Sequence, residues 1–541
     1  MTLHNTRQKI FEIVASWRVL VEQLVSATAS PGHGRRVMIV ILIAYSAVWV
    51  AYAIIAKSTQ GIHADMAEIF SWSWDLEWGT HKHPPLLPAL VSLWFSIFPV
   101  SDWAYYLLAV ISTAVAIYFT WLLSGFWLQG AKRAAVPFLL MLIPFYNFLA
   151  LKLDHNAILM PLWAITTYAF VRSFQTRSIP WSVLTGIFAG LAVLAKYWSF
   201  FLLLGLASAA LADSRRLGYL KSSTPWIIAF ISFGLFLPHI LWLEANHYPT
   251  FIAAQHRLAD SMAETTRYLW GYVYNSVGYV AGPLLAVALL ARPSRSALAD
   301  VLFPRDRDRR FAAVIFWVPL LAAIPFSLFM QVRLTSLWSM SAFSLLGVVL
   351  LSSPLVDFTR KSAAVVASIA IVVSIAALLA SPLIAVQKLH GGVENHAAYT
   401  RAMAKEVQEQ WDQSTSQPLR IVGSIFSLAN SVTFYLEKKA LPVWFYARTR
   451  PPWDTAETID QFGAALICPA ASVACRSTMT RIAAGRPVAR HAEVTIQPHW
   501  LGFSGDPRAF VIDIVLPQIR NQAAEEFCCI SAARRTKRID R

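Results

Sequence analysis

The feature that most constrains this chain is a series of apolar runs, each about long enough to cross a lipid bilayer. A membrane-spanning helix needs ~20 mostly apolar residues. Runs of roughly this kind lie near residues 37–56, 103–128, 134–151, 157–171, 181–195, 197–212, 225–243, 271–291, 311–332, 334–356 and 363–387. With 57% hydrophobic residues and 14% charged residues, the chain of 541 residues has more apolar surface than one soluble core encloses. The sequence therefore predicts an α-helical polytopic membrane protein with about 11 transmembrane helices.

The distribution of basic residues predicts how these spans are oriented, because Lys and Arg collect in the cytoplasmic loops of membrane proteins. If the N-terminus is cytoplasmic, the inside segments hold 20 Lys and Arg residues and the outside loops only seven. Residues 1–36 carry five basic residues before any long apolar run, so we expect an amphipathic cytoplasmic segment rather than a signal peptide. Residues 37–387 then form the transmembrane part, and the loop 57–102 faces outward.

The chain after residue 388 has a different pattern. The segments "LRIVGSI", "LPVWFYA", "AALICP" and "RAFVIDIVLP" read as strands between helical and turn segments. We therefore expect residues 388–541 to form a small α/β domain on the outer, periplasmic side. The net charge of +16 is spread over this tail and the cytoplasmic loops, which indicates contact with anionic membrane lipids rather than with nucleic acid.

All the cysteines of the chain lie in this tail: Cys468, Cys475, Cys528 and Cys529. Such a distribution is typical of an oxidising compartment. A disulfide between Cys468 and Cys475 and a pair of buried free thiols are equally good interpretations of the first two. The adjacent pair near the C-terminus has no physical explanation at this level.

An unusual concentration of polar residues directly follows the first apolar run. The stretch "HADMAEIFSWSWDLEWGTHKHPPLLPALV", residues 63–91, contains Asp65, Glu68, His81, Lys82 and His83. Ionisable groups at a membrane boundary usually line a cavity or carry function. The structural alternative is that Asp65 only caps the helix that follows it, as Asp often does.

This stretch resembles the signature D-E-A-Y-Y-W … W-G-Y-x-D-H-P-P-L of the GT-C superfamily of membrane glycosyltransferases, which includes the protein mannosyltransferases and the lipid A aminoarabinose transferase. Counting back from Pro84 and Pro85, Trp78 and Gly79 fall on the Trp-Gly of the signature. Asp65 falls on its acidic residue. The resemblance covers roughly residues 36–390.

Two later segments are also similar to the family. "LKLDHNAILMPLWAITTYAFVRSF" resembles the segment with the second outward-facing acidic residue, here Asp154. "GIFAGLAVLAKYWSFFLLLG" resembles the glycine-rich span with an outward lysine, here Lys196. The alternative for Lys196 is a lysine that extends from the end of a span toward the water.

The chain departs from the signature at two positions. Met66 stands where the signature has a second acidic residue, and Glu68 on the same helical turn is the expected substitute. His83 stands where the aminoarabinose transferase has a lysine that binds the donor phosphate, so Lys82 or His81 is expected to supply the positive charge.

The resemblance implies transfer of a sugar, with inversion, from a polyprenyl phosphate to an acceptor on the outer face of a bacterial inner membrane. The acceptor would be lipid A or the lipopolysaccharide core, another glycolipid, or a protein. A leaving phosphate needs positive charge, so the cationic candidates for substrate binding are His81, Lys82, His83, Lys196, Arg257 and Arg333. Glu68 joins the candidate substrate-binding residues as the substitute for the missing second carboxylate of the signature. A hydroxyl acceptor needs a base, for which Asp65 is the first candidate and Asp154 the second.

Other functions and ligands are weighed against this interpretation. His81 and His83 stand two positions apart with no third ligand evident, so no metal site is expected among these residues. The sequence does not decide whether the reaction uses a divalent cation as a cofactor. The chain has no phosphate-binding loop for a nucleotide. A transporter or flippase of lipid-linked sugars is the first alternative, but transporters usually place ionisable residues at mid-membrane. The second is an O-antigen ligase or polymerase, which uses a large external loop later in the chain.

Overall fold

The computed structural model describes residues 2–390, 396–446 and 451–518, with the backbone alone for residues 2–11 and 14. The chain divides into two compact units. Unit 1 comprises residues 1–51, 105–245 and 254–379, and unit 2 comprises residues 52–104, 246–253 and 380–541. Four helices have residues in both units: α2 (Gly34–Ala56), α5 (Asp102–Ser124), α12 (Pro249–Gln255) and α18 (Arg360–Leu389).

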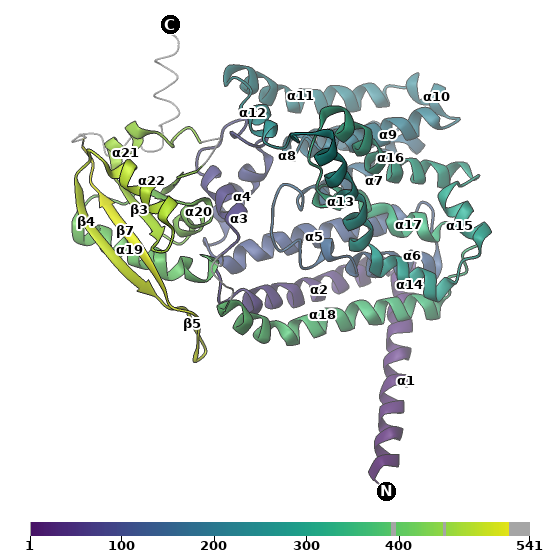
Figure 1. Cartoon of the computed structure of the whole chain (residues 1–541). Coiled ribbons are helices and arrows are strands. Elements are labelled where there is room, and N and C mark those ends of the chain that lie inside the picture. The colour runs from purple at the N-terminus through teal and green to yellow at the C-terminus, as the bar shows by residue number, and fades with distance from the viewer. Residues whose placement is uncertain (1, 391–395, 447–450, 519–541) are drawn as a thin grey trace. The chain divides into compact units, whose positions relative to one another are not determined.

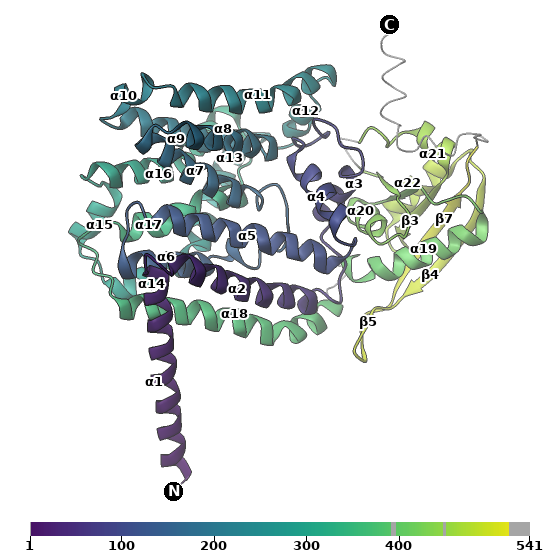
Figure 2. The same ribbon diagram turned by 180° about the vertical axis from the view of Figure 1, so that it is seen from behind.

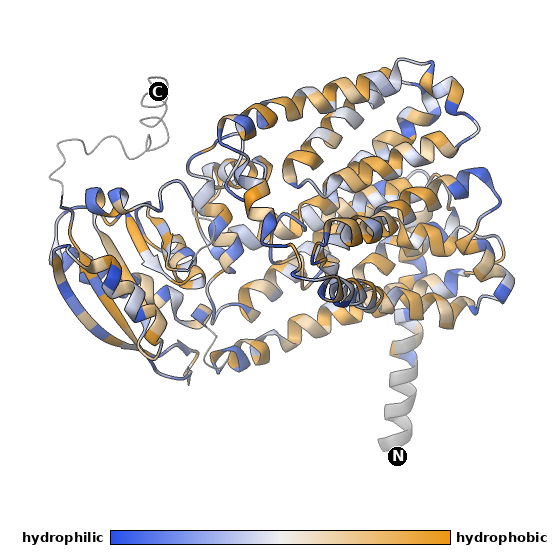
Figure 3. Ribbon diagram, turned by 45° about the horizontal axis from the view of Figure 1, so that its top comes forward, coloured by the Kyte–Doolittle hydropathy of each residue, from blue (hydrophilic) through white to orange (hydrophobic). Residues whose placement is uncertain are grey.

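Unit 1 is a bundle of apolar helices (Figures 1 and 2). Its remaining elements are α1 (Thr2–Ala29), α6 (Gly130–Met141), η1 (Pro144–Tyr146), α7 (Leu159–Thr176), α8 (Ile179–Ala195), α9 (Ser199–Ala212), α10 (Arg216–Leu220), α11 (Thr224–Ala245), α13 (Met262–Tyr279), α14 (Ala281–Ala291), α15 (Arg295–Leu302), α16 (Arg307–Met330), η2 (Ser336–Leu345) and α17 (Leu346–Leu351). Helix α8 packs against α7 and α11, and α9 packs against α16. Apolar residues dominate these helices, and polar residues gather at the connections between them (Figure 3).

Small residues allow the close approach of α8 and α11. A Cβ atom on Gly186 would lie 2.8 Å from the Cβ of Ile231, and one on Gly190 would lie 3.0 Å from the Cβ of Leu235. Glycines four positions apart let two helices pack closely inside a membrane, where no hydrophobic effect drives helices together.

Several of the predicted spans are helices of membrane-crossing length. In the described part of the chain, five helices are long and apolar enough to cross a membrane: α2, α5, α11, α16 and α18. The pair α13 and α14, bent by 52°, would add a sixth as one broken span. The predicted runs at 181–195 and 197–212 correspond to shorter apolar helices, α8 and α9. The multi-pass, mostly helical architecture is therefore present, and the number of about 11 spans stays a prediction.

Unit 2 combines the segment after the first span with the tail. Its elements are α3 (Ala64–Trp72), α4 (Leu86–Ile97), η3 (His396–Tyr399), α19 (Thr400–Ser414), β1 (Ile421–Ser424), α20 (Phe426–Phe434), β2 (Leu441–Trp444), α21 (Ala456–Phe462), β3 (Ala464–Pro469), α22 (Val473–Ala483), β4 (Val488–Ile496), β5 (His499–Trp500), β6 (Phe503–Ser504) and β7 (Arg508–Val515). The five-stranded sheet has the order β2-β1-β3-β7-β4, with β1 parallel to β2 and β3, and β7 antiparallel to β3 and β4. The four segments predicted as strands form β1, β2, β3 and β7.

Strands β1, β2 and β3 are buried along their whole length, which explains why helices cover both faces of this sheet. Side chains of a strand point alternately to opposite faces. Ala465 and Ile467 pack with α19 and α20 in one buried cluster, whereas Ala464 and Leu466 pack with α21 and α22 in the other. The tail is therefore a three-layer α/β/α arrangement built around a mostly apolar sheet (Figure 1).

The second of these clusters contains a disulfide. Cys468 at the end of β3 is bonded to Cys475 in α22, with a Cα–Cα distance of 5.7 Å. Of the two interpretations of this pair, the disulfide is thus confirmed. Cys528 and Cys529 lie outside the described residues.

Polar contacts and aromatic packing fix the segment after the first span against the tail within unit 2. Helix α3 packs against α20, with the rings of Phe70 and Phe434 5.0 Å apart. The hydroxyl of Tyr435 accepts a hydrogen bond from the backbone N–H of Ile62 and donates to the carboxylate of Asp102 at 2.9 Å. Arg401 donates to the same carboxylate. The segment after the first span is therefore packed against the folded tail of the same chain and is not an exposed loop.

Candidate functional site

The predicted site residues fall into two groups, one in each unit. Unit 2 holds Asp65, Glu68, His81, Lys82 and His83. Unit 1 holds Asp154, Lys196, Arg257 and Arg333. The geometry of each group is set by contacts within its own unit.

Asp65 lies in the first turn of α3 and does not cap it. The N-cap is His63, whose Nδ1 accepts a hydrogen bond from the backbone N–H of Asp65 at 3.1 Å. The alternative interpretation of Asp65 as a helix cap is therefore wrong. Its carboxylate, with a side chain 37% exposed, lies 3.9 Å from His63 Nδ1 and is open to solvent. A carboxylate in the first turn is also favoured by the positive end of the helix dipole.

Glu68 stands one turn further along α3 and is buried. The Nζ atom of Lys82 donates to Glu68 Oε1 at 2.5 Å, and the two side chains are 26% and 7% exposed. Residues three apart on a helix share a face, so Asp65 and Glu68 lie on the same side of α3. Glu68 is therefore buried against Lys82, whereas the Asp65 side chain is partly exposed.

A tight turn presents Lys82. The Oγ1 atom of Thr80 accepts hydrogen bonds from the backbone N–H groups of Lys82 and His83, at 3.2 and 2.9 Å. The backbone N–H of Thr80 donates to the carbonyl of His83 at 2.9 Å. Pro85 follows directly as the N-cap of α4, so proline and the turn together end the polar stretch. The backbone that carries Lys82 is therefore fixed on both sides.

His81 points into an aromatic environment instead of toward a ligand site. Its ring lies 5.4 Å from the rings of both Trp72 and Trp444. Burial, together with the neighbouring charge of Lys82, lowers the pKa of His81 to about 3. The imidazole is therefore neutral at physiological pH, and Lys82 is the cation of this stretch. The ring of His83 lies 6.2 Å from Trp72.

The group in unit 1 centres on a turn that begins at Asp154. One carboxylate oxygen accepts hydrogen bonds from the backbone N–H groups of Asn156 and Ala157, at 2.8 and 3.0 Å. The other accepts from Asn156 Nδ2 at 3.2 Å and lies 4.0 Å from Lys152 Nζ. This is the local pattern by which Asp favours turns. Both oxygens of Asp154 are thereby engaged in orienting Asn156.

Asn156 in turn holds Lys196. The Nζ atom of Lys196, at the C-cap of α8, donates to Asn156 Oδ1 at 2.5 Å and lies 4.8 Å from the ring of Trp338. The pKa of Lys196 is lowered to about 7, mainly by burial; Asp154 opposes this shift and Arg257 adds to it. Lys196 therefore lies against specific partners, Asn156 and Trp338. This differs from the alternative interpretation, in which the side chain extends from the end of a span into water.

The two predicted arginines are joined by a short backbone pairing. The backbone N–H of Arg333 donates to the carbonyl of Arg257 at 2.8 Å, and Leu258 pairs with Val332. The guanidinium of Arg333 forms ion pairs with Asp260 at 3.0 Å and with Glu264 at 3.1 Å. Arg333 is therefore already neutralised by carboxylates, which makes it a weaker candidate for binding a phosphate than Lys196.

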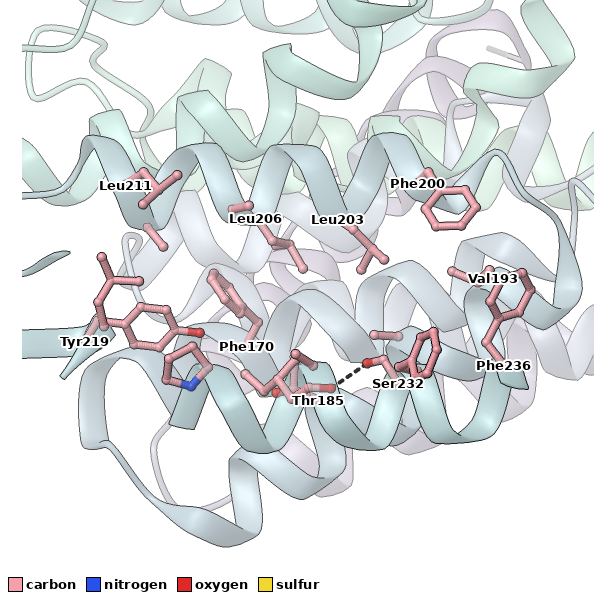
Figure 4. A pocket seen from close by; sticks show the side chains of 18 residues that line it. Phe170, Thr185, Val193, Phe200, Leu203, Leu206, Leu211, Tyr219, Ser232 and Phe236 are labelled. Carbon is pink, nitrogen blue, oxygen red and sulfur yellow. Dashed lines mark hydrogen bonds between the residues drawn. The ribbon is translucent and has the colours of Figure 1, made fainter. Parts of the chain in front are cut away.

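A separate apolar cavity lies between α8, α9 and α11 (Figure 4). Its volume is about 460 Å³, and leucine, phenylalanine and alanine side chains dominate its walls. The hydroxyls of Ser232 and Thr185 are satisfied internally, because Ser232 donates to the carbonyl of Ile228 at 2.7 Å and Thr185 to that of Trp181 at 2.7 Å. The mostly apolar lining suits hydrocarbon better than a sugar or a phosphate.

Among residues 2–390, 396–446 and 451–518, no three or more His, Cys, Asp or Glu side chains are grouped so that they could hold a metal ion.

Comparison with known proteins supports the resemblance, over a range that begins at Lys82. Residues 82–242 match the family model of the dolichyl-phosphate-mannose-protein mannosyltransferases. The matched range includes Lys82, Asp154 and Lys196. The resemblance to GT-C glycosyltransferases that the sequence indicates is confirmed.

Solved structures support the same assignment at the level of the fold. ArnT from Cupriavidus metallidurans in the apo state is 12% identical, with a TM-score of 0.57 over 88% of this chain and 97% of ArnT. ArnT bound to undecaprenyl phosphate is 14% identical, with a TM-score of 0.54 over the same shares of the two chains. The chain has the GT-C glycosyltransferase fold. No curated protein sequence shows significant similarity to this chain.

The residues around the two lysines were not all predictable. Asn156 could have been found, because Asp followed two positions later by Asn in a loop is a turn pattern. Phe426 and Trp444, which flank Lys82, and Trp338, which flanks Lys196, lie far along the chain from the lysines that they contact. A single sequence contains no signal for such pairs.

Proposed function

We propose that this GT-C protein transfers a sugar from a polyprenyl-phosphate donor to an acceptor of the cell envelope. The acceptor is lipid A or the lipopolysaccharide core, another glycolipid, or a protein, and the reaction takes place on the outer face of a bacterial inner membrane. Support for the donor comes from ArnT, which has the same fold and has been crystallised with undecaprenyl phosphate. The basic cytoplasmic loops support the orientation.

The observation that carries this proposal is the difference between the two carboxylates of α3. Glu68 is buried and paired with Lys82, whereas Asp65 presents its carboxylate to solvent on the same face of the helix. A base must be reachable by its substrate, and a cation for a phosphate must be fixed in place. Asp65 and Lys82 meet these two requirements from neighbouring positions in the fold of unit 2.

The reaction that follows is a single displacement. Asp65 accepts the proton of the acceptor hydroxyl while the acceptor oxygen bonds to the anomeric carbon. The bond from that carbon to the phosphate oxygen breaks, and the polyprenyl phosphate leaves with the bonding electrons. Lys82 and Lys196 are the proposed partners of phosphate charge. Attack opposite the leaving group inverts the anomeric configuration.

Asp65→Asn is the decisive experiment. The substitution keeps the volume and removes the charge, so the protein should insert and accumulate as the parent does. Transfer of sugar from a polyprenyl phosphate should fall by ~100-fold or more, because a general base contributes roughly 10²–10⁴ in rate. Donor binding should change little, since an anionic donor gains nothing from a nearby carboxylate. Asp75→Asn, an exposed carboxylate of the same segment, is the matched control.

Two outcomes would contradict the proposal in different ways. An Asp65→Asn protein that transfers sugar at the parental rate would remove Asp65 from the mechanism. A parent protein that moves lipid-linked sugar across vesicles and never transfers it would instead support the flippase alternative.

A further inference from the structure

The side chain of Lys82 is enclosed by residues of the tail as well as by Glu68. Its Nζ atom lies 4.8 Å from the ring centre of Phe426 and 4.6 Å from that of Trp444. These two rings meet edge to face, with their centres 5.1 Å apart. We call Glu68, Phe426 and Trp444 the Lys82 cage.

The chemistry of this cage favours a lysine that is fixed and still able to bind an anion. A cation within ≈6 Å of an aromatic ring is attracted by the negative face of the ring. The ammonium group has three N–H donors, and the rings accept none of them in ordinary hydrogen bonds. The cage therefore limits where the flexible Lys82 side chain can lie, while N–H donors of its ammonium group remain available to bind an anion.

The aromatic walls of the cage belong to regular elements. Phe426 is the first residue of α20, and Trp444 is the last residue of β2. The backbone N–H of Trp444 donates to the buried carboxylate of Asp454 at 3.2 Å, and β2 pairs along its length with β1. The sheet of the tail thus sets the position of the wall, so the cage is rigid on the side of Trp444.

We propose that Phe426 and Trp444 are positioning residues that hold the Lys82 ammonium group for the phosphate of the lipid-linked donor, which replaces Glu68 as its anionic partner. The inference rests on the proposed function, because it assumes that Lys82 binds this phosphate. In this proposal the tail contributes to binding of the donor through Phe426 and Trp444, although neither ring contacts the reacting atoms.

A comparison of tryptophan variants tests the inference. Trp444→Ala should raise the KM for a short-chain polyprenyl-phosphate sugar by about tenfold, in the range of a desolvated cation–π contact, with kcat within about twofold of the parent. Trp444→Phe keeps a ring and should recover most of this loss. Trp453→Ala is the matched control: it removes a tryptophan that donates to the carbonyl of Pro442 in β2 and for which the described residues provide no cation contact.

A double-mutant cycle separates positioning from general loss of structure. If Trp444 acts through Lys82, adding Trp444→Ala to Lys82→Ala should not raise KM further. Additive effects of the two substitutions, an unchanged KM in Trp444→Ala, or an equal rise in Trp453→Ala would each overturn the inference.

A measurement without activity distinguishes failure of this inference from failure of the proposed function. Lysines carrying ¹³C-methyl groups give separate NMR signals, and that of Lys82 is assigned by its loss in Lys82→Arg. The nearby rings should displace the Lys82 signal, and Trp444→Ala should return it toward that of an exposed lysine. Inorganic phosphate added to the parent should shift this signal and no signal of an exposed lysine. An undisplaced Lys82 signal overturns the cage, whereas a displaced signal in a protein that transfers no sugar overturns only the proposed function.

Discussion

Loss of the Glu68 charge should destabilise unit 2, because Glu68→Gln leaves the ammonium group of Lys82 without this carboxylate in a largely buried place. Glu68 is 7% exposed and Lys82 26% exposed. Two unit charges about 4 Å apart interact by ~4 kcal/mol at an effective dielectric constant of ~20. Removing one partner of a fully buried pair costs ~3–5 kcal/mol. The partial exposure of Lys82 and its aromatic neighbours reduce the expected loss to about 2–3 kcal/mol.

Thermal unfolding of the purified protein, followed by tryptophan fluorescence in a fixed detergent, measures this loss. A unit of this size loses ~2–4 °C per kcal/mol, so the unfolding temperature of Glu68→Gln should fall by about 4–12 °C. Asp75→Asn removes an exposed carboxylate from the same segment and should change it by less than about 1 °C.

The double variant Glu68→Gln with Lys82→Met sharpens the test. It removes the unpaired charge as well, and replacing both partners of a buried pair by uncharged groups is often close to neutral. The double variant should therefore be more stable than Glu68→Gln alone. A Glu68→Gln protein as stable as Asp75→Asn, or a double variant less stable than the single one, would refute the argument from the buried charge.

Three further outcomes are expected. In a background without reactive native thiols, single cysteines at positions 75 and 416 should react with a membrane-impermeant reagent in intact cells. A cysteine at position 296 should react only after lysis, and the reverse pattern would refute the predicted topology. Cys468 and Cys475 should resist alkylation until they are reduced. Because burial lowers the pKa of Lys196 to about 7, its charge is present below this pH and is lost above it, so the KM for an anionic donor should rise between roughly pH 6.5 and 8.5. The rise should be absent in Lys196→Arg, and an identical pH profile in that variant would exclude Lys196 as its cause.

Local patterns predicted a large part of this fold. The segments read as strands became β1, β2, β3 and β7, because alternation along a strand already determines which side chains face each layer. The spacing and compartment of Cys468 and Cys475 allowed a disulfide but left it undecided against two free thiols, and the structure shows the disulfide. The Asp65 region is recognisable because its signature is contiguous. In each case the determinants lie within a few residues of one another.

Sequence reasoning was incomplete where burial and contacts between distant residues set the state of a side chain. His81 was a candidate cation by residue type, but its position between two tryptophans makes it neutral. Asp is a better helix cap than His by general preference, and yet His63 caps α3. Arg333 was a candidate for donor binding, and its pairing with Asp260 could not be foreseen from sequence alone.

The contrast between Asp65 and Asp154 leads to a last prediction. Sequence places both among the candidate carboxylates of the reaction, but in the structure Asp154 uses both oxygens to orient Asn156, which binds Lys196. In Asp154→Asn, an NH₂ group would face the Nδ2 of Asn156, two donors that repel each other. Rotation of the Asn156 amide relieves this conflict and turns its Nδ2 group toward the lysine.

Asp154→Asn should therefore behave like Lys196→Ala, with a raised KM for the donor and a kcat reduced much less than in Asp65→Asn. Steady-state kinetics on the three variants distinguishes the roles, because loss of a base lowers kcat whereas loss of a donor contact raises KM. Asn156→Ala, which removes the amide and leaves Asp154 charged, should match Lys196→Ala as well. If Asp154→Asn lowered kcat as strongly as Asp65→Asn while Asn156→Ala left the KM unchanged, Asp154 would act on the acceptor itself and not through Lys196.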